Sequence, residues 1–419
     1  MTNADDTSQT PLNDGAPAQG ADTIVTRLAG KGDGVTADGR FVPGTAPGDY
    51  VAQNGDITHG PHHSAPACRH YTKCGGCQLQ HIDDASYSQF LQDRLSAALT
   101  AQRVVIPPLR TPHLSPPHSR RRAMLKAQRI GRDVLIGFNE SRSHKIIDMR
   151  QCPVLDPALF ALIAPLRKLL ATMLPRRGVG TIQLTLADQG VDVLLSGMDA
   201  DGLDSAAALF DFAMDHSLAR LAIDSGNGPE DRWAPDPVSI TFGGVPVPLP
   251  HAPFLQATRD GEAALIATVK DIVGPATAIA DLFSGLGTFA MSLCDDAQVL
   301  AVEAARDAVT CMQRAANLHH RTVKSEHRDL YRRPLTPAEL SKFGAVVLDP
   351  PRAGAEDQCA ELAHSTVPVI AYVSCNPQSF ARDAALLIAG GYHIDWIQPV
   401  GQFRWSTHME LVARLSRKS

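Results

Sequence analysis

The sequence predicts an α/β protein of two or three domains, with a largely parallel sheet in its C-terminal part. Its 419 residues correspond to that domain number at roughly 100–200 residues per domain. Hydrophobic residues make up 44% and charged residues 20% of the chain, which is typical of globular proteins and excludes wholesale disorder. After Pro253, apolar strand-like segments alternate with helical patterns, and this alternation is typical of βαβ units.

Composition also limits location and partners. The chain has no uncharged apolar run of about 18 residues, so the sequence predicts no membrane-spanning helix and no membrane association. The first residues, MTNADDTSQT, lack the basic start and apolar core of a secretory signal, so we expect a cytoplasmic protein. The net charge of −5 gives no global indication of nucleic-acid binding. No feature indicates an obligate protein partner.

The N-terminal region divides into a tail and a β-rich segment. Residues 1–20 contain no Lys, Arg or aromatic residue, which predicts a disordered tail. From Ile24 to Val51, short β-prone pieces are separated by Gly-Asp-Gly, Asp-Gly and Pro-Gly turns. This pattern predicts a small β-barrel or open sheet, and a purely structural appendage would have the same composition.

The central region mixes helices and strands, and a proline-rich connector over Pro246–Pro253 follows it. We expect a helix over His81–Ala101, strand-like segments within Arg103–Arg150, two helices around Leu155–Leu174 and a hairpin around Asp188–Gly190. The strands of the C-terminal βαβ sheet are expected at Ala278–Phe283, Ala297–Glu303, Gly344–Arg352, Pro368–Ser374 and Met409–Leu415.

A glycine-rich loop after the first of these C-terminal strands predicts a ligand site. Gly285 and Gly287 lie in the loop Ser284–Phe289, where glycine lets a ligand approach backbone N–H groups closely. Their spacing is not that of the pyrophosphate-binding GxGxxG motif. Glu303 ends the next strand, 22 residues after Asp281, where a carboxylate can accept hydrogen bonds from both ribose hydroxyls. The combination favours a nucleoside ligand without phosphates, S-adenosylmethionine, over a structural turn.

Two further acidic residues belong to this predicted site. Asp349 ends the strand GAVVL, and Pro350 and Pro351 fix the chain as it leaves the carboxyl edge of the sheet, where open α/β sheets bind ligands. Asp329, in the segment HRDLY, is a candidate adenine contact, with an ordinary surface turn as the alternative.

Cys375 and Glu410 are the candidate catalytic residues. Cys375 has left an apolar strand and stands among Ser374, Asn376 and Pro377, whereas an inert structural cysteine usually lies within the apolar run. A thiolate at this position would be nucleophilic if its pKa were depressed. Glu410 precedes the apolar segment LVARL, so burial is expected to raise its pKa and make it a workable base, with a solvated strand-end glutamate as the alternative.

Four of the eight cysteines have the spacing of metal ligands: Cys68, Cys74, Cys77 and Cys152. Clustered cysteines in an intracellular chain indicate metal binding or catalysis more often than disulfides. Thiolates select zinc or an iron–sulfur cluster, and His70 and His81 offer a mixed Cys/His zinc site. Spacing alone does not separate these two centres, or exclude four unrelated thiols. The Cys-x3-Cys-x2-Cys pattern of radical S-adenosylmethionine chemistry is absent.

A basic segment predicts where RNA could bind. Nine basic and three acidic residues between Arg120 and Arg150 give a local net charge of +6. Such a segment can neutralise phosphates without base-specific contacts, although a solvated surface is the alternative. Its basic members are Arg120, Arg121, Arg122, Lys126, Arg129, Arg132, Arg142, Lys145 and Arg150.

Four motifs, DLFSGLGTF, DPPR, SCNP and the terminal HME, resemble those of the RNA uracil-5-methyltransferase family, which acts on 23S ribosomal RNA or tRNA. The resemblance extends from about residue 22 to the end, with the motifs in the family's order. It implies that Cys375 is the nucleophile and Glu410 the base. It also implies that the methyl donor is contacted by Gln256, Phe283, Glu303 and Asp349.

The same resemblance bears on the cysteines and the N-terminal region. One branch of the family has this cysteine spacing around a [4Fe-4S] cluster, which implies a structural or RNA-positioning cluster. The segment Phe41–Gly44 resembles the small OB-like RNA-binding domain of the ribosomal-RNA branch, shortened here to about 35 residues. Cytosine-5 RNA methyltransferases carry a second cysteine in the Asp-Pro motif, where this chain has Pro351 and Arg352. That difference favours uracil.

We therefore expect methylation of uracil C5 in 23S rRNA through a covalent Cys375–uracil adduct. The expected domains are a tail (1–20), a trimmed OB-like domain (21–60), a central α/β domain with the iron–sulfur site (61–250) and a Rossmann-like class I methyltransferase domain (251–419). A tRNA uracil-5-methyltransferase and a non-catalytic iron–sulfur RNA-binding assembly factor are the alternatives.

Overall fold

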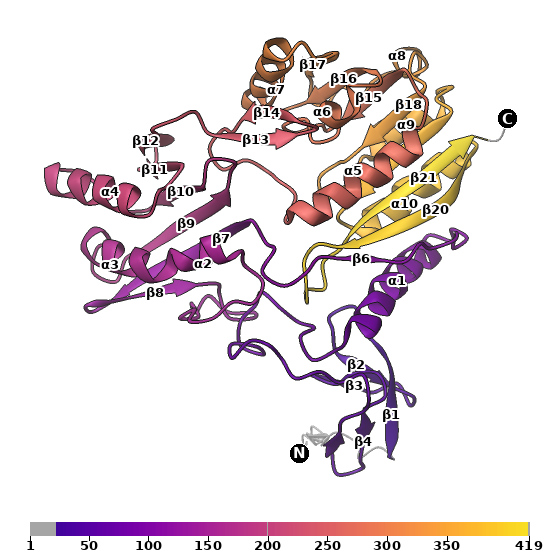
Figure 1. Cartoon of the computed structure of the whole chain (residues 1–419). Helices are drawn as coiled ribbons and strands as arrows, with labels where there is room; N and C mark the ends of the chain where they lie inside the picture. Colours follow the sequence, from indigo (N-terminus) through magenta and orange to yellow (C-terminus); the bar gives the residue numbers. More distant parts are fainter. Residues whose placement is uncertain (1–21, 199, 418–419) are drawn as a thin grey trace, which may run out of the picture.

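The computed structural model describes residues 22–198 and 200–417, so the tail predicted over 1–20 lies outside the described residues. The β-rich N-terminal segment forms a five-stranded antiparallel sheet in the order β3-β2-β1-β4-β5, at the bottom of Figure 1. Its strands are β1 (Thr23–Leu28), β2 (Gly34–Thr36), β3 (Phe41–Val42), β4 (Tyr50–Val51) and β5 (Ile57–Thr58). None of the helices in the described ranges combines the length and apolar character needed to cross a bilayer.

The central region forms a six-stranded sheet in the order β12-β11-β10-β9-β7-β8. The predicted hairpin around Asp188–Gly190 is confirmed, because β9 and β10 pair antiparallel on either side of it. The strands are β7 (Arg122–Ile130), β8 (Asp133–Gly137), β9 (Val179–Leu186), β10 (Val191–Ser196), β11 (Arg220–Asp224) and β12 (Pro229–Trp233). The helices of this region are α2 (Pro157–Ala161), α3 (Ile163–Met173) and α4 (Leu203–Asp215).

The C-terminal region is an eight-stranded sheet in the order β17-β16-β15-β18-β19-β21-β20-β6. The first five of these strands are mutually parallel, as the alternating pattern predicts. The last long strand, β21, inserts antiparallel between β19 and β20. The strands are β6 (His113–Leu114), β15 (Ala278–Leu282), β16 (Gln298–Glu303), β17 (Val323–His327), β18 (Ala345–Leu348), β19 (Val369–Ser374), β20 (Tyr392–Gly401) and β21 (Glu410–Arg417).

Helices cover this sheet, and local capping explains where several of them begin. The side chain of Thr258 accepts the Gly261 N–H at the start of α5, and Asn376 accepts the Gln378 N–H directly before Pro377 of α10. The helices are α5 (Arg259–Val273), α6 (Ala290–Leu293), α7 (Arg306–Leu318), α8 (Pro337–Leu340), α9 (Glu356–Ala363) and α10 (Pro377–Ala389).

The packing does not follow the predicted boundaries of the central domain, 61–250. Helix α1 (Asp84–Ala101) buries Tyr87 and Phe90 in the same core as Tyr372 of β19, and it lies beside β20 and α10 in Figure 1. The hairpin β13–β14 (Ser239–Phe242 and Val245–Pro248) buries Phe242 against the core of α5. These elements therefore belong to the C-terminal core, because their buried side chains pack in it and not in the core of the central sheet.

A buried ion pair joins the central sheet to the C-terminal region. Arg121 is 2% exposed, and its Nε donates to the Gln256 carbonyl at 3.0 Å. Its Nη2 pairs with the carboxylate of Glu262 on α5. Arg121, predicted as part of an RNA-binding surface, is therefore an internal residue.

We expect Arg121→Ala to destabilise the protein by about 3–5 kcal/mol, because it leaves the buried Glu262 carboxylate without its partner. The midpoint of urea unfolding measures the loss. The matched control is Arg132→Ala, which removes an exposed arginine and should change stability by no more than about 0.5 kcal/mol. Equal midpoints for both variants would contradict the structural role of Arg121.

Candidate active site and metal centre

A cavity of about 520 Å³ opens at the carboxyl ends of β15, β16 and β18. This is the edge at which open α/β sheets bind ligands. All six residues predicted to contact the methyl donor line it: Gln256, Phe283, Gly285, Glu303, Asp329 and Asp349. Residues that are almost 100 positions apart in the sequence therefore meet at one site.

The glycine-rich loop shapes the floor of this cavity. Gly287 has φ +90°, and a Cβ there would lie 2.8 Å from the sulfur of Met312, so only glycine fits. The Gly285 N–H donates to one oxygen of Glu303 at 2.9 Å. The other Glu303 oxygen accepts the N–H groups of Ala304 and Ala305 at 2.7 and 2.8 Å. Glu303 is thus held at the cavity wall by backbone donors.

The polar groups of the cavity suit a cationic nucleoside such as S-adenosylmethionine. Ser284 lines the cavity, and its buried Oγ has no hydrogen-bond partner within the described residues, so it is available to a ligand. The rings of Phe283 and Tyr331 lie 5.4 Å apart and form an aromatic wall. Carboxyl groups and an aromatic wall are the complement of a sulfonium ion and a purine.

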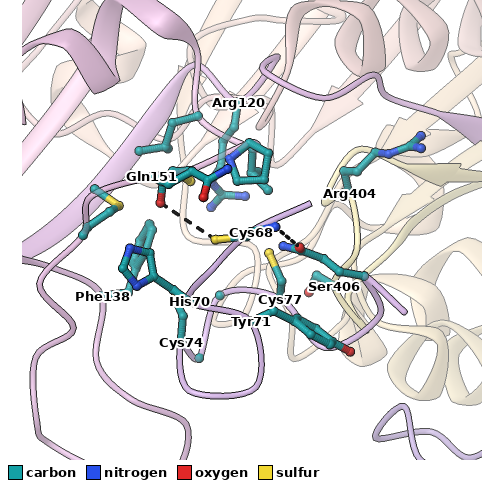
Figure 2. A pocket seen from close by; sticks show the side chains of 18 of the residues that line it. Cys68, His70, Tyr71, Cys74, Cys77, Arg120, Phe138, Gln151, Arg404 and Ser406 are labelled. Atoms are coloured by element: carbon teal, nitrogen blue, oxygen red, sulfur yellow. Dashed lines mark hydrogen bonds between the residues drawn. The ribbon is translucent and has the colours of Figure 1, made fainter. Parts of the chain in front are cut away.

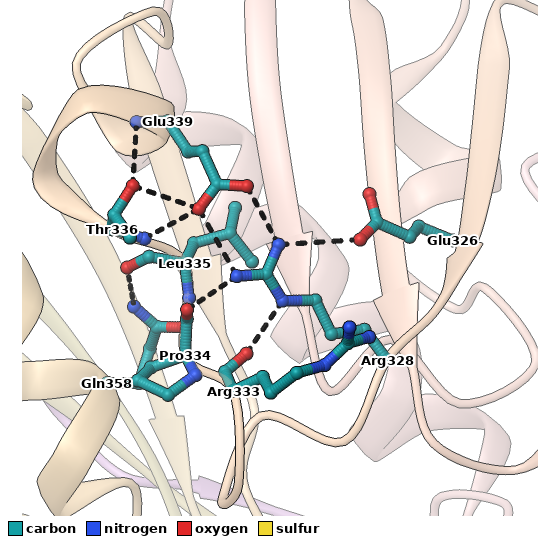
Figure 3. Close-up of polar contacts among 8 residues, drawn as sticks. All are labelled: Glu326, Arg328, Arg333, Pro334, Leu335, Thr336, Glu339 and Gln358. Carbon is teal, nitrogen blue, oxygen red and sulfur yellow. Dashed lines mark hydrogen bonds and ion pairs between the residues drawn. The ribbon is translucent and has the colours of Figure 1, made fainter.

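A network around Arg328 holds the loop that carries Asp329 and Tyr331 (Figure 3). Arg328 forms ion pairs with Glu339 at 2.8 Å and Glu326 at 3.4 Å. It also donates to the carbonyls of residues 333 and 334, both at 2.6 Å. The hydrogen bonds from Arg328 lower the pKa of Glu339 to about 2. The pair therefore stays ionised at neutral pH and keeps this wall of the cavity in place.

Cys375 and Glu410 meet at the ends of two paired strands. Ser374, the last residue of β19, pairs with Leu411 of β21, so Cys375 and Glu410 occupy adjacent positions one step further along. Glu410 is 3% exposed, and burial raises its pKa well above the usual value, as the sequence suggested.

The condition for a nucleophilic Cys375 thiolate, a depressed pKa, is not met in the free protein. Burial raises the pKa of Cys375 to about 11, and the nearby carboxylates of Glu410 and Asp349 add to the effect. The thiol is therefore protonated at neutral pH before RNA binds.

Gln402 links Glu410 to the donor cavity, and the sequence analysis missed it. Its Nε2 donates to Gln256 Oε1 at 2.7 Å, while its own Oε1 accepts the Ala257 N–H at 2.8 Å. It also hydrogen-bonds Glu410. Gln256 in turn lies 3.5 Å from the Asp349 carboxylate. A buried glutamine in a polar segment has no sequence pattern, so only the tertiary contacts identify it.

The four predicted cysteine ligands line a second cavity, of about 260 Å³ (Figure 2). All four are free thiols: Cys68, Cys74, Cys77 and Cys152. Apolar side chains, including Phe138, Ile147 and Leu155, form much of the remaining wall. His70 lines this cavity, but its Nε2 accepts the Arg150 N–H at 3.0 Å. His81 is bonded elsewhere, to the Thr45 carbonyl at 3.0 Å and to Tyr71, so it does not complete a mixed zinc site.

The four cysteine thiols suit a thiolate-bound metal centre. Zinc and iron–sulfur clusters both take four thiolate ligands. Four thiols that line one largely apolar cavity therefore fit either centre.

The cysteine cavity adjoins the segment that leads to Glu410. Phe403, Arg404, Ser406 and His408 line it together with the cysteines, and Figure 2 shows Arg404 and Ser406 at its edge. The N–H groups of Gln78 and Leu79 both donate to the Trp405 carbonyl, at 2.8 and 2.9 Å. The cysteine loop therefore supports the segment that carries the candidate base.

The basic residues do not form the single patch predicted over 120–150. Lys145 and Arg150 are paired with Glu140 and Asp148. The arginines that influence the catalytic groups come from three separate parts of the chain. Arg94, Arg120 and Arg352 all lower the pKa of His408, and Arg122 and Arg352 act on Glu410. Arg94 and Arg352 lie outside the predicted segment, because this cationic rim forms only when α1 packs on the C-terminal sheet.

The profile of the tRNA (uracil-5-)-methyltransferase family matches residues 254–418. The chain is also 31% identical to the 23S rRNA (uracil(1939)-C(5))-methyltransferase RlmD of Chromohalobacter salexigens, over 94% of this chain and 88% of that protein. The chain belongs to the RNA uracil-5-methyltransferase family. An uncharacterized RNA methyltransferase of Zymomonas mobilis is 48% identical to this family member, over 94% of the chain and 99% of that protein.

A solved structure shares the fold of this uracil-5-methyltransferase. The tRNA (uracil-54, C5)-methyltransferase of Pyrococcus abyssi, in complex with S-adenosyl-L-homocysteine, superimposes with a TM-score of 0.72 at 22% identity. The match covers 94% of this chain and 99% of that chain. The predicted α/β class with a Rossmann-like methyltransferase domain is thereby confirmed.

Donor affinity is expected to depend on pH through Asp349. Burial raises the pKa of Asp349 to about 7, so the group is neutral below that pH and ionised above it. An ionised carboxylate attracts the sulfonium charge, so affinity for S-adenosylmethionine should increase about tenfold from about pH 6 to about pH 8. Isothermal titration calorimetry measures this change. S-adenosylhomocysteine lacks the sulfonium charge, so its affinity should not change with pH. Asp349→Asn should also bind either ligand with an affinity that does not change with pH. An equally steep pH dependence for S-adenosylmethionine in Asp349→Asn would show that another group titrates.

Proposed function

We propose that this protein transfers a methyl group from S-adenosylmethionine to C5 of a uridine in 23S rRNA. The observation that carries the proposal is the pairing of β19 with β21, which sets Cys375 beside Glu410. Asp349, which lines the donor cavity, lies close enough to influence both groups. Similarity to RlmD over 94% of the chain supports ribosomal RNA as the substrate. The five-stranded N-terminal sheet, as the trimmed OB-like domain, is an additional RNA-binding element.

Cys375 supplies the nucleophile in this proposal. Uracil C5 is a weak nucleophile, and addition of the Cys375 sulfur to C6 converts the ring to an enolate whose C5 can take the methyl group. Because the free thiol is protonated, its proton must leave as the uracil binds. Asp349 lies close enough to raise the thiol pKa, and its own pKa of about 7 leaves it partly ionised at neutral pH. It can therefore accept the thiol proton, which leaves Glu410 for the later step.

Glu410 completes the reaction as the base. After methyl transfer, C5 carries both a hydrogen and the new methyl group. Removal of the C5 proton by the Glu410 carboxylate restores the double bond and expels the Cys375 thiolate from C6. Gln402 hydrogen-bonds Glu410 and lowers its pKa, which helps the carboxylate to remain available in a buried site.

The uracil must leave its base stack before its face can be attacked, so the target is a flipped or single-stranded uridine. Arg122 and Arg352 lie near Glu410, and Arg94 and Arg120 lie with Arg352 near His408. These arginines suit the phosphates that flank such a nucleotide.

The residues of the second cavity fit a [4Fe-4S] cluster, and Cys68, Cys74, Cys77 and Cys152 would hold it. Such a cluster cross-links chain segments and has no part in methyl transfer. Its four ligands would join the loop at 68–77 to the turn after Arg150, beside the segment leading to Glu410.

The reaction and substrate are tested together. Purified protein is incubated with labelled S-adenosylmethionine and unmodified 23S rRNA, 16S rRNA or tRNA, and the digested nucleosides are identified by mass spectrometry. 5-Methyluridine from 23S rRNA alone supports the proposal. 5-Methyluridine from tRNA would keep the mechanism and change the substrate, whereas no methylated nucleoside would favour a non-catalytic RNA-binding protein.

Cys375→Ala is expected to abolish 5-methyluridine formation, because no other described group replaces the attacking sulfur. Donor affinity should change less than twofold, because Cys375 does not line the donor cavity. Cys311→Ala, which removes a thiol that lines neither cavity, is the matched control and should retain full activity. Normal turnover by Cys375→Ala would remove Cys375 as the nucleophile.

Glu410→Gln is expected to accumulate a covalent protein–RNA adduct, because methyl transfer can proceed but the C5 proton cannot be removed. The adduct is measured as a slowly migrating band on a denaturing gel, with the labelled methyl group in it. Double substitution of Cys375 and Glu410 should eliminate the band. Rapid release of normal product would show that another group acts as the base.

A further inference from the structure

Three potential metal ligands meet in the N-terminal sheet, away from both cavities described above. They are Asp49, directly before β4, and His59 and His63, which follow β5. One ligand atom from each lies within 4.8 Å of the other two. Within the described residues, these are the three potential ligands that satisfy this distance, and no sequence pattern predicts them.

Asp49 is held rigidly in position. Its side chain is fully buried, with Oδ1 accepting the Gly60 N–H at 2.7 Å and Oδ2 accepting the Ala46 N–H at 2.9 Å. Two backbone donors therefore fix the carboxylate independently of its contacts with the imidazoles. Gly60 is required here, because a Cβ at that position would lie 2.3 Å from the Gly48 carbonyl oxygen.

Two imidazoles approach the same carboxylate oxygen. The Nδ1 atom of His63 lies 2.8 Å, and that of His59 3.5 Å, from Asp49 Oδ2. The two rings are stacked, with centroids 3.5 Å apart and planes at 26°. An imidazole binds a metal ion through the free lone pair of its neutral form, so both rings are chemically able to act as ligands.

One of the two distances is close to that between ligands of a small divalent ion. Zinc bonds of about 2.0–2.1 Å to nitrogen and oxygen imply ligand–ligand distances of about 3.3 Å in a tetrahedron, and His59 Nδ1 lies 3.5 Å from Asp49 Oδ2. The 2.8 Å separation of His63 is a hydrogen bond, so a metal ion would replace the proton that His63 and Asp49 share. Two imidazole nitrogens and a carboxylate oxygen are borderline ligands that suit zinc better than calcium or magnesium.

We propose that Asp49, His59 and His63 form a zinc site, distinct from the cysteine centre. The fourth position faces solvent, because the His59 side chain is 58% exposed. The site would fasten the turn before β4 to the segment after β5. That segment is bonded to the residues just before α1, because the Ser64 N–H donates to the His81 carbonyl at 2.9 Å and His63 forms a β-bridge with Ile82. Zinc here would therefore tie the N-terminal sheet to the body of the enzyme.

The test compares zinc content among single variants of the full-length protein with its cysteine centre intact. Wild type, His59→Ala, His63→Gln and His62→Ala are equilibrated with zinc chloride and gel-filtered, and bound metal is measured by mass spectrometry. His62 is the matched control, because it lies in the same segment but its Nδ1 contacts Asp83 at 2.8 Å. His63→Gln retains a side chain that can hydrogen-bond Asp49, so it separates metal loss from misfolding.

We expect wild type and His62→Ala to hold one more zinc per chain than His59→Ala and His63→Gln. Zinc at the cysteines is common to all four proteins and cancels in the difference. When cobalt replaces zinc as the probe, wild type and His62→Ala should show more visible d–d absorption than the other two variants. Their thiolate charge-transfer absorption should be the same as that of the other two variants. Equal zinc content in all four proteins would overturn the proposal. It would also be overturned if thiolate charge-transfer absorption disappeared together with the metal lost in His59→Ala and His63→Gln.

Discussion

The antiparallel pairing of β21 with β19 is the constraint on which the candidate catalytic site depends. The Ser374–Leu411 register sets Cys375 next to Glu410, although 34 positions separate them in the chain. Strand side chains alternate between faces, so a shift of one residue would turn Glu410 to the opposite side of the sheet. The long β20–β21 ladder secures this register. A strand pairing thus determines whether nucleophile and base can act on one uracil.

Burial of several acidic residues at one edge of the sheet raises their pKa values and so sets the protonation states of the site. Burial raises the pKa of Asp281, Asp349 and Glu410, and their mutual repulsion raises those of Asp281 and Glu410 further. The same environment keeps the Cys375 thiol protonated. Ionised carboxylates favour a cationic ligand, so binding of the sulfonium donor is coupled to the protonation state of these acids.

The segment between β20 and β21 connects otherwise separate parts of the molecule. The Tyr87 hydroxyl of α1 donates to the carbonyl of Phe403 at 3.1 Å, and Gln402 bonds Gln256 next to the donor cavity. The cysteine loop donates to the Trp405 carbonyl. Contacts from three distant regions thus fix one short segment ahead of Glu410. This gives a physical reason for a structural centre more than 200 residues away in sequence to influence catalysis.

The sequence by itself determined the parallel sheet and the polar residues at its strand ends. Hydrophobic runs that stop at Asp349 or Cys375 must place these residues at one edge, because parallel strands end together there. The cysteine spacing likewise indicated one centre. Only the tertiary structure decided that Arg121 is internal and that Gln402 reaches Glu410. Burial and long-range contacts, which local patterns do not encode, set these roles and the protonated state of the thiol.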